Sequence, residues 1–503
     1  MIDRSYKTRS SSFFSRLYTF FKVRFLFTLL FIPLSAADLL VSGVLGVRFA
    51  FGTFFTTDDL QEQRLASQRK YSTIFSKNLW ALTACIFGIM NPKLISFYFT
   101  LQRTDKPGIG AGGDYYRDPN ALQVEPETID DVLQAVKKAV VEGKKVMPVG
   151  AGRSQGKQFL PDTGNASIIL DLAKLNDVTI DVASKTVTVG AGACWADIQR
   201  AADKKKLALQ VMQASNVFSV GGSIGTNIHG WEQRLGVLAN TILEMTIVNA
   251  KGELQTLTHK DELFYHILGG AGLFGIVVEA KIQLTDNELM QEVGTKIAPE
   301  EFIEHFRRNV QPNTDIGMHL YRLSISPDNM LGEGIAVDYV RTNPGVGLRT
   351  ENLKMEPAEG TRLNKIMLNL ARRIGAVRSM YWKSEVRRLT KAEPAEPQTR
   401  NQIMQPPINA MFNAAESESE WLQEYFLPPE TLAEFLKELS NILTENEVPL
   451  INASVRYVPQ YDKSPLSYAH DGERFAVVLC FNQALDNEAI VRAEKWLRKN
   501  NPW

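Results

Sequence analysis

The stretch Pro148–Gln158, PVGAGRSQGKQ, is the part of the chain that decides the fold. It follows a short β-prone segment, Lys144–Met147, and carries glycines at 150, 152 and 156 with a serine at 154. Glycine tolerates positive φ and lets the backbone approach a ligand closely. Successive free N–H groups in such a loop form a concave anion site. The loop therefore predicts a site for a phosphate or pyrophosphate.

Three interpretations of this loop compete. In a nicotinamide-type Rossmann loop, Gly150 and Gly152 fit and Asp171 stands near the place of the ribose-binding acid. Its third glycine comes one place late, however, and Pro161 and Gly164 would interrupt the crossover helix. The second interpretation is a structural turn between two strands. The third is a flavin pyrophosphate loop, which depends on motifs further along the chain.

Composition narrows the function classes. The 503 residues suffice for two or three domains with substantial cores. The 56 basic and 56 acidic residues balance, which gives no support for a nucleic-acid partner. Cys85, Cys194 and Cys480 lie far apart and the histidines are scattered, so we expect neither a disulfide framework nor a metal site.

The amino-terminal hundred residues are more apolar than the rest. Phe25–Val47 carries Asp38 as its one charge, and about 20 apolar residues span a bilayer core. A second apolar run, Leu79–Leu101, is interrupted and would be a returning span, a re-entrant piece or an interfacial helix. A cleaved secretory signal and a buried soluble helix pair are the alternatives. We expect membrane attachment through residues 1–105, with the catalytic part in the cytoplasm because of the basic flanks.

Beyond the first loop, three more glycine-rich motifs follow in order. They are VTVGAGACWADI at 187–198, SVGGSIGTNIHG at 219–230 and GGAGLFGIVVEA at 269–280. Around them the pattern predicts a helix over Ile129–Glu142, a hairpin over 178–189 and a helix over Ala196–Lys206. The ordered set resembles the FAD-binding PCMH-type domain of the vanillyl-alcohol-oxidase family over residues 116–286. Within that family it is similar to oxidases of lipid-linked sugars, sugar alcohols and aldonolactones, and to sterol C24 reductases.

The resemblance implies an FAD held by two α+β subdomains. The pyrophosphate would lie on the first loop, and the ribityl chain and ring along the third motif. A strand after the fourth motif would add backbone contacts. The implied cofactor-binding residues are Val149, Gly150, Ala151, Gly152, Arg153, Ser154, Gly221, Gly222, Ile224, Gly225, Thr226, Asn227, Gly230, Ile276 and Val277.

One position departs from many family members. Where they carry a histidine that bonds covalently to the flavin, this chain has Arg153. Arginine cannot make that bond, so the resemblance implies a non-covalent FAD. Arg153 itself is either a partner of the phosphates or a solvated loop charge.

Two residues are candidates for catalysis. In relatives the histidine of the His-Gly pair, here His229, lies beside the flavin ring, where neutral imidazole can accept a proton; packing in the loop is its alternative role. A Glu-x-Arg strand in sugar-oxidising relatives corresponds here to Ser454 and Arg456. Arg456 would steady an alkoxide-like oxygen or the charge of reduced flavin, unless it is only a charge on the sheet face. Tyr457 should face the opposite side.

The carboxyl-terminal half resembles the cap domain of the family. Antiparallel strands are expected over Gly317–Ile325, Gly334–Arg341, Leu450–Val458 and Arg474–Asn482, with a long arginine-rich helical region over Leu363–Thr390. The segment Pro394–Pro407 reads as a loop, and Glu488–Lys499 as a closing helix. The arginines would be solvated, or would meet anionic headgroups or a lipid-linked phosphate.

The sequence thus predicts an α+β fold in three parts. These are a membrane-associated region (1–105), a two-subdomain FAD-binding PCMH-type domain (106–287) and an α+β cap with an antiparallel sheet (288–503). The expected function is FAD-dependent oxidation of a CH–OH group in a sugar, sugar alcohol or lipid-linked sugar. The alternatives are an NADPH-dependent flavin reductase of a lipid or sterol C=C bond, and a catalytically defective flavin-binding membrane protein.

Overall fold

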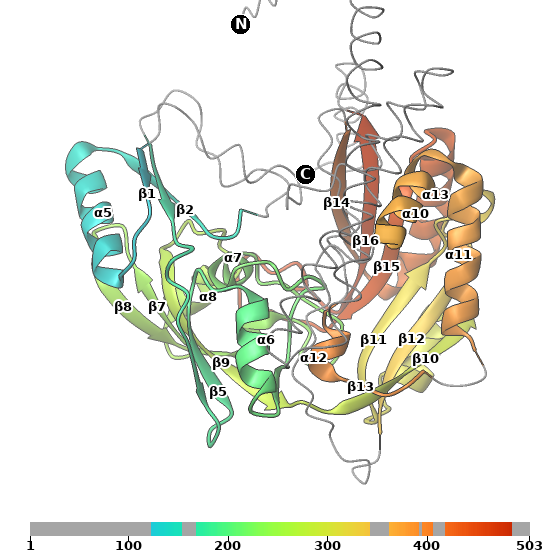
Figure 1. Ribbon diagram of the computed structural model, residues 1–503, viewed down its shortest axis with the longest axis horizontal. Helices are drawn as coiled ribbons and strands as arrows, with labels where there is room; N and C mark the ends of the chain where they lie inside the picture. The colour runs from blue at the N-terminus through green and yellow to red at the C-terminus, as the bar shows by residue number, and fades with distance from the viewer. Residues whose placement is uncertain (1–121, 153–166, 343–361, 392–394, 406–417, 485–503) are drawn as a thin grey trace, which may run out of the picture. The chain divides into compact units, whose positions relative to one another are not determined.

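A computed structural model describes residues 122–152, 167–342, 362–391, 395–405 and 418–484 (Figure 1). All of them belong to Thr104–Trp503, the second of two units into which the chain divides. The predicted membrane region and the predicted closing helix lie outside these residues. Among the helices that are described, none combines the length and the apolar character needed to cross a membrane.

The first subdomain is a small parallel sheet covered by one helix. Its strands pair in the order β1–β3–β2, and they span Leu122–Val124 (β1), Lys145–Val149 (β2) and Ser167–Asp171 (β3). Helix α5 (Ile129–Glu142) has the predicted bounds. It begins at a capping box between Thr128 and Asp131 and ends at Gly143, whose φ of 63° suits glycine. Val132 and Leu170 are fully buried between the helix and the sheet.

The second subdomain is an antiparallel sheet in the order β4–β5–β9–β7–β8, with β6 also paired to β9. Its strands are β4 (Val178–Asp181), β5 (Thr186–Gly190), β6 (Leu207–Leu209), β7 (Ile242–Val248), β8 (Leu254–Thr258) and β9 (Ile276–Asp286). The helices are α6 (Trp195–Asp203), α7 (Val220–Thr226), η2 (Leu238–Thr241) and α8 (Glu262–Ile267). The predicted hairpin and helix are confirmed, and the two subdomains together match the expected arrangement.

The cap is a seven-stranded antiparallel sheet in the order β13–β10–β12–β11–β15–β16–β14. Its strands are β10 (Leu289–Ile297), β11 (Ile316–Leu323), β12 (Gly334–Arg341), β13 (Gln398–Thr399), β14 (Glu418–Leu427), β15 (Leu450–Val458) and β16 (Arg474–Ala484). Its helices are α9 (Phe302–His305), η3 (Phe306–Val310), η4 (Pro327–Asn329), α10 (Arg362–Arg373), α11 (Gly375–Leu389), α12 (Arg400–Ile403), η6 (Pro429–Thr431) and α13 (Leu432–Glu445).

The two faces of the cap sheet are packed differently. On one face, Tyr457 and Phe475 meet the rings of α9 and η3; the Tyr457 and Phe306 ring centroids are 4.6 Å apart. The other face carries Arg456 and lies under α10 and α11 (Figure 1). Tyr457 therefore faces away from Arg456, as the strand alternation predicts.

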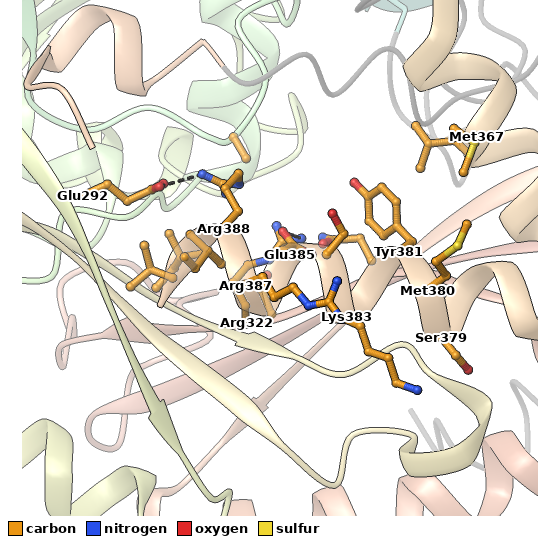
Figure 2. Close-up of a pocket in the computed structure, with 18 of the residues that line it drawn as sticks. Glu292, Arg322, Met367, Ser379, Met380, Tyr381, Lys383, Glu385, Arg387 and Arg388 are labelled. Carbon is orange, nitrogen blue, oxygen red and sulfur yellow. Dashed lines mark hydrogen bonds and ion pairs between the residues drawn. The ribbon is translucent and has the colours of Figure 1, made fainter. Parts of the chain in front are cut away.

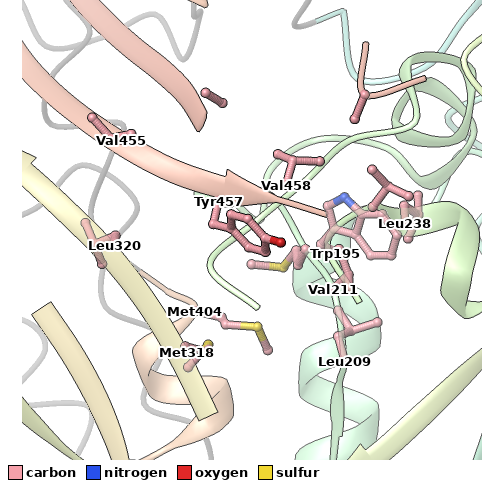
Figure 3. Close-up of a cluster of buried hydrophobic side chains, with 14 of the residues drawn as sticks. Trp195, Leu209, Val211, Leu238, Met318, Leu320, Met404, Val455, Tyr457 and Val458 are labelled. Carbon is pink, nitrogen blue, oxygen red and sulfur yellow. The ribbon is translucent and has the colours of Figure 1, made fainter. Parts of the chain in front are cut away.

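The cap is joined to the FAD-binding sheets by a continuous core. Figure 3 shows Trp195, Leu209 and Val211 from the second subdomain beside Met404 and Val458 from the cap. Buried apolar contact of this kind is the main favourable term in holding two such parts together.

The prediction of a loop over Pro394–Pro407 is wrong for its described part, 395–405, which contains β13 and α12. Thr399 and Gln402 make a capping box that begins α12. Arg400 then points inward, where Nε and Nη2 donate to the carbonyls of Leu209 and Gln210 at 2.9 and 2.6 Å. Its role as a buried clamp between the two parts explains why a polar, turn-rich stretch is ordered. The predicted arginine-rich helical region is also two helices, with an extended Ile374 between them.

Candidate active site

The first glycine loop meets the third at the start of α7. The Ala151 N–H donates to Ser219 Oγ at 3.2 Å, and Ser219 is the N-cap of α7. A Cβ built on Gly150 would lie 2.0 Å from the same Oγ, closer than real Cβ atoms approach any neighbour. Glycine at 150 is thus required for the two loops to touch. The structure brings together two motifs that the sequence places about 70 residues apart.

The glycines of α7 and its exit divide into two kinds. Those at 221 and 230 are tightly packed: a Cβ there would meet Ala191 Cβ at 2.9 Å and Met212 O at 2.1 Å. A Cβ on Gly225 would have no protein atom closer than 3.7 Å. Packed glycines pin the backbone of this segment, and a Cβ on Gly225 would make ordinary contact with the turn at Ala271 and Gly272.

An unpartnered donor lies at the end of the same helix. Asn227 ends α7 in the left-handed conformation (φ 45°), and its Oδ1 accepts from the Ala239 N–H at 3.0 Å. Its Nδ2 is buried and has no hydrogen-bond partner among the described residues. A buried, unpartnered donor at the end of a glycine-rich helix fits an acceptor-rich ring such as a flavin.

The other predicted cofactor contacts lie in different settings. Ile276 and Val277 are buried and pair with Val248 and Ile247 of β7. Arg153 and Ser154 lie outside the described residues. All of the predicted contacts with FAD therefore stay predictions, although Gly150, Ala151 and the 221–230 segment do gather in one place.

His229 and Arg456, predicted from separate domains, lie near a common third residue. His229 is 4% exposed, and its Nε2 lies 3.3 Å from Oε2 of Glu424 on β14. Its ring packs edge-on against Phe426 and Tyr468, with centroid separations of 5.6 and 5.7 Å. His229 Nδ1 has no hydrogen-bond partner in the described part of the chain.

Strand register places Glu424 and Arg456 on the same face of the cap sheet. Val478 of β16 stands between Glu424 and Ser454, and Ala476 stands between Phe426 and Arg456. Residues paired across neighbouring strands point to the same side. All of these side chains therefore project from the face opposite Tyr457.

The charges of neighbouring side chains keep Glu424 ionised beside Arg456. Partial burial alone would raise the pKa of Glu424, but His229 and Arg456 outweigh it and hold its pKa below the ordinary carboxyl value. Burial lowers the pKa of Arg456 from a very high starting value, against the attraction of Glu424. Arg456 is 7% exposed, and its Nε has no hydrogen-bond partner among the described residues. The site thus holds an ionised carboxylate beside a guanidinium.

Tyr468 ties the cluster to the predicted cofactor segment. Its hydroxyl donates to the Asn227 carbonyl at 2.6 Å, and its ring stacks on Phe426 at 4.1 Å. Burial raises the pKa of Tyr468 well above its ordinary value, so the phenol stays protonated and keeps donating. The contact fixes the position of the His229–Glu424 pair relative to the end of α7.

The sequence did not reveal Glu424. The expected carboxylate, two positions before Arg456, is replaced by Ser454, which argues against an aldonolactone or simple polyol substrate. In the structure a carboxylate comes instead from β14, which is separated from β15 by β16. Glu424 sits in an alternating strand of ordinary composition, and only the pairing of β14 with β16 reveals its neighbours.

A cavity of about 1320 Å³ opens on the same face of the sheet, between β11, β12, β15 and helix α11. Arg456, Ser454 and Asn452 line it from β15, and Trp231 lines it from the FAD-binding side. Figure 2 shows the ion pair between Arg388 and Glu292, whose atoms are 2.6 Å apart. Arg322 pairs with Glu385 at the same separation. These two arginines of the wall are therefore compensated by carboxylates.

Within the described ranges, no three His, Cys, Asp or Glu side chains gather in a way that would hold a metal ion.

Residues 120–258 match the family described as "FAD binding domain". The chain carries an FAD-binding domain. This confirms the resemblance to the PCMH-type FAD oxidoreductases, and FAD is the cofactor. The match covers Gly150 and Ala151 of the first loop and the third motif with His229, which gather at the site described above.

Curated relatives agree over the same region. The chain is 33% identical over 170 residues to a decaprenylphosphoryl-β-D-ribose oxidase of Mycolicibacterium smegmatis, covering 33% of this chain and 36% of the relative. It is 29% identical over 167 residues to a D-arabinono-1,4-lactone oxidase of Candida glabrata, covering 32% and 31%. A cytokinin dehydrogenase of Arabidopsis thaliana is 31% identical over 166 residues, covering 32% of each. The matches span about a third of the length of these relatives.

Solved structures extend the likeness of fold over the cap. The BBE-like protein 28 of Arabidopsis thaliana has a TM-score of 0.55 at 14% identity, covering 79% of this chain and 80% of its own. A variant of Phl p 4, described as a glucose oxidase, has a TM-score of 0.56 at 13% identity, covering 81% and 85%. At such identities the agreement concerns the fold alone. The chain combines an FAD-binding domain with a cap of this architecture.

Proposed function

We propose that the protein oxidises a CH–OH group of a sugar, sugar alcohol or lipid-linked sugar. The observation that carries the proposal is the gathering of His229, Glu424 and Arg456 beside the end of α7. A carbinol oxidation needs a group that takes the hydroxyl proton and a group that steadies the oxygen left behind. When bound, FAD supplies the acceptor for the hydride.

The three side chains divide these tasks. Glu424 is ionised and keeps 27% of its side chain exposed, so it is available to take the proton. His229 positions the Glu424 carboxylate through the 3.3 Å contact between its Nε2 and Glu424 Oε2. The Arg456 guanidinium, with its unpartnered Nε, faces the cavity and stabilises negative charge on the substrate oxygen. Phe426 and Tyr468 pack around His229 and keep water from its ring.

The relatives support this choice of donor without deciding it. Among them are oxidases of a lipid-linked ribose and of an arabinono-lactone, and also a cytokinin dehydrogenase. Membrane attachment through residues 1–105, with the catalytic part in the cytoplasm, stays part of the proposal because a lipid-linked donor would be met there. The non-covalent state of FAD, inferred from Arg153, belongs to it as well.

Anaerobic absorbance measurements on the purified, FAD-loaded protein test the proposal. Bleaching of the flavin by polyols, sugars or glycolipids supports it. Bleaching by NADPH and by none of these donors would instead support the reductase of a C=C bond, and no bleaching by any donor would indicate a catalytically defective flavoprotein. Acid precipitation should leave a yellow supernatant, since a covalent flavin would stay in the pellet.

A further inference from the structure

The cavity beside the active site is larger than a single sugar requires. Its volume of about 1320 Å³ exceeds the roughly 300–1,000 Å³ of most small-molecule pockets. It begins at Arg456, and Asn452 lines it four residues away along β15. At about 3.3 Å per residue, the Cα atoms of these two residues lie roughly 13 Å apart. A lone sugar ring whose carbinol reaches Arg456 would leave Asn452 uncontacted.

The far part of the cavity carries hydrogen-bonding groups without partners. Asn452 is 9% exposed, and its Oδ1 has no hydrogen-bond partner among the described residues. Arg322 Nε is also buried and has no hydrogen-bond partner among the described residues. Arg322 pairs with Ser454 in the β11–β15 register. Buried polar atoms are nearly always satisfied, so an orphaned acceptor and donor that line one cavity indicate a bound ligand.

The two unpartnered atoms of this wall suit a hydroxyl group. A hydroxyl both donates and accepts, so it can satisfy Asn452 Oδ1 and Arg322 Nε alike. A phosphate or carboxylate would be repelled by the Asn452 oxygen, and Arg322 is already paired with Glu385. Trp231 and Tyr339 line the same cavity with their rings nearly parallel, at 10° and 6.0 Å between centroids. Such apolar ring surfaces suit the C–H face of a sugar.

We propose that Asn452, Ser454 and Arg322, with the Trp231–Tyr339 pair, form a subsite for a second sugar unit next to the one that is oxidised. The donor is then a disaccharide or a sugar bearing a further hydroxylated unit. This deepens the proposed function and rests on it for the identity of the oxidised unit. The binding of the second unit does not depend on turnover.

Calorimetric titration of the FAD-loaded protein with glucose, galactose, cellobiose, maltose and lactose tests the subsite. At least one disaccharide should bind about tenfold more tightly than its monosaccharides, which corresponds to one or two added hydrogen bonds. Asn452→Leu should remove this preference while leaving monosaccharide affinity and melting temperature unchanged. Asn452→Asp keeps the acceptor oxygen and should keep the preference. Asn441→Leu, on the exposed side of α13 and outside the cavity lining, is the matched control.

The outcomes separate this inference from the proposed function. If no disaccharide binds more tightly than its monosaccharides, or if Asn452→Leu retains the preference, the subsite is refuted even when sugars bleach the flavin. If the preference is present and is lost in Asn452→Leu, but no carbinol donor bleaches the flavin, the subsite stands and the oxidation proposal fails.

Discussion

The most informative perturbation of the proposed site is Glu424→Gln. Glutamine keeps the shape of the side chain and can still donate to or accept from His229 Nε2 across the 3.3 Å contact. It cannot take a proton from a hydroxyl group, and it leaves Arg456 without its nearest charge partner in the cluster. The fold and the FAD-binding surface around α7 are untouched by the change.

The expected effect follows from the task assigned to Glu424. A positioned general base contributes about 10²–10⁴ in rate. That range corresponds to roughly 3–5 kcal/mol of barrier. We therefore expect the limiting rate of anaerobic flavin bleaching by a carbinol donor to fall by a factor in that range. The FAD content of Glu424→Gln should match that of the native protein, and its melting temperature should be lower because Arg456 stays buried without its charge partner.

The assay is rapid mixing under anaerobic conditions with absorbance detection. Glu434→Gln is the matched control, since Glu434 is exposed on α13, whose Phe435 packs on Tyr425, and Tyr425 points to the opposite sheet face from Glu424. A Glu424→Gln protein that bleaches within about twofold of the native rate would refute the base assignment, because a positioned general base contributes about 10²–10⁴ in rate.

Three further predictions concern Arg456, helix α7 and the buried Arg400. Arg456→Met removes a guanidinium that lowers the pKa of Glu424, so this pKa should rise in the variant. Glu424 would then become protonated at a higher pH as the pH falls. A pH–rate profile should show bleaching lost at higher pH in the variant than in the native protein. Gly225→Ala should raise apoprotein stability by up to about 1 kcal/mol in helix α7, because its methyl would meet Gly272 N and Ala271 Cα at 3.7 and 3.9 Å without a clash; a lower stability in urea unfolding would argue against this packing. Arg400→Leu leaves two buried carbonyls unpaired and should cost about 3 kcal/mol in urea unfolding.

Much of the fold was predictable because local patterns and tertiary structure agree. Helix α5 has an apolar stripe, a capping box at Thr128 and a glycine at its end, so its bounds follow from the sequence alone. The glycine motifs were readable for a related reason. At Gly150 and Gly230 the backbone approaches other atoms too closely for any side chain. Glycine is therefore needed at these positions, and the sequence shows it directly.

The rest of the site depended on strand pairing over long distances. Glu424 reaches His229 only because β14 joins the edge of the cap sheet next to β16, and nothing in the local pattern of β14 specifies that neighbour. Arg400 was missed for a similar reason, since its partners are backbone carbonyls about 190 residues away. Those contacts arise from the fold as a whole and leave no periodic signal.

We propose that a carbinol C–H bond is broken as the flavin is reduced in a site built from Glu424, His229 and Arg456. Anaerobic bleaching should therefore be timed with the best carbinol donor of the panel, unlabelled and deuterated at the carbinol carbon. If this proposal holds, deuteration should slow bleaching severalfold. Equal rates for the two donors, with chemistry shown to be the limiting step, or bleaching that only NADPH can produce, would contradict it.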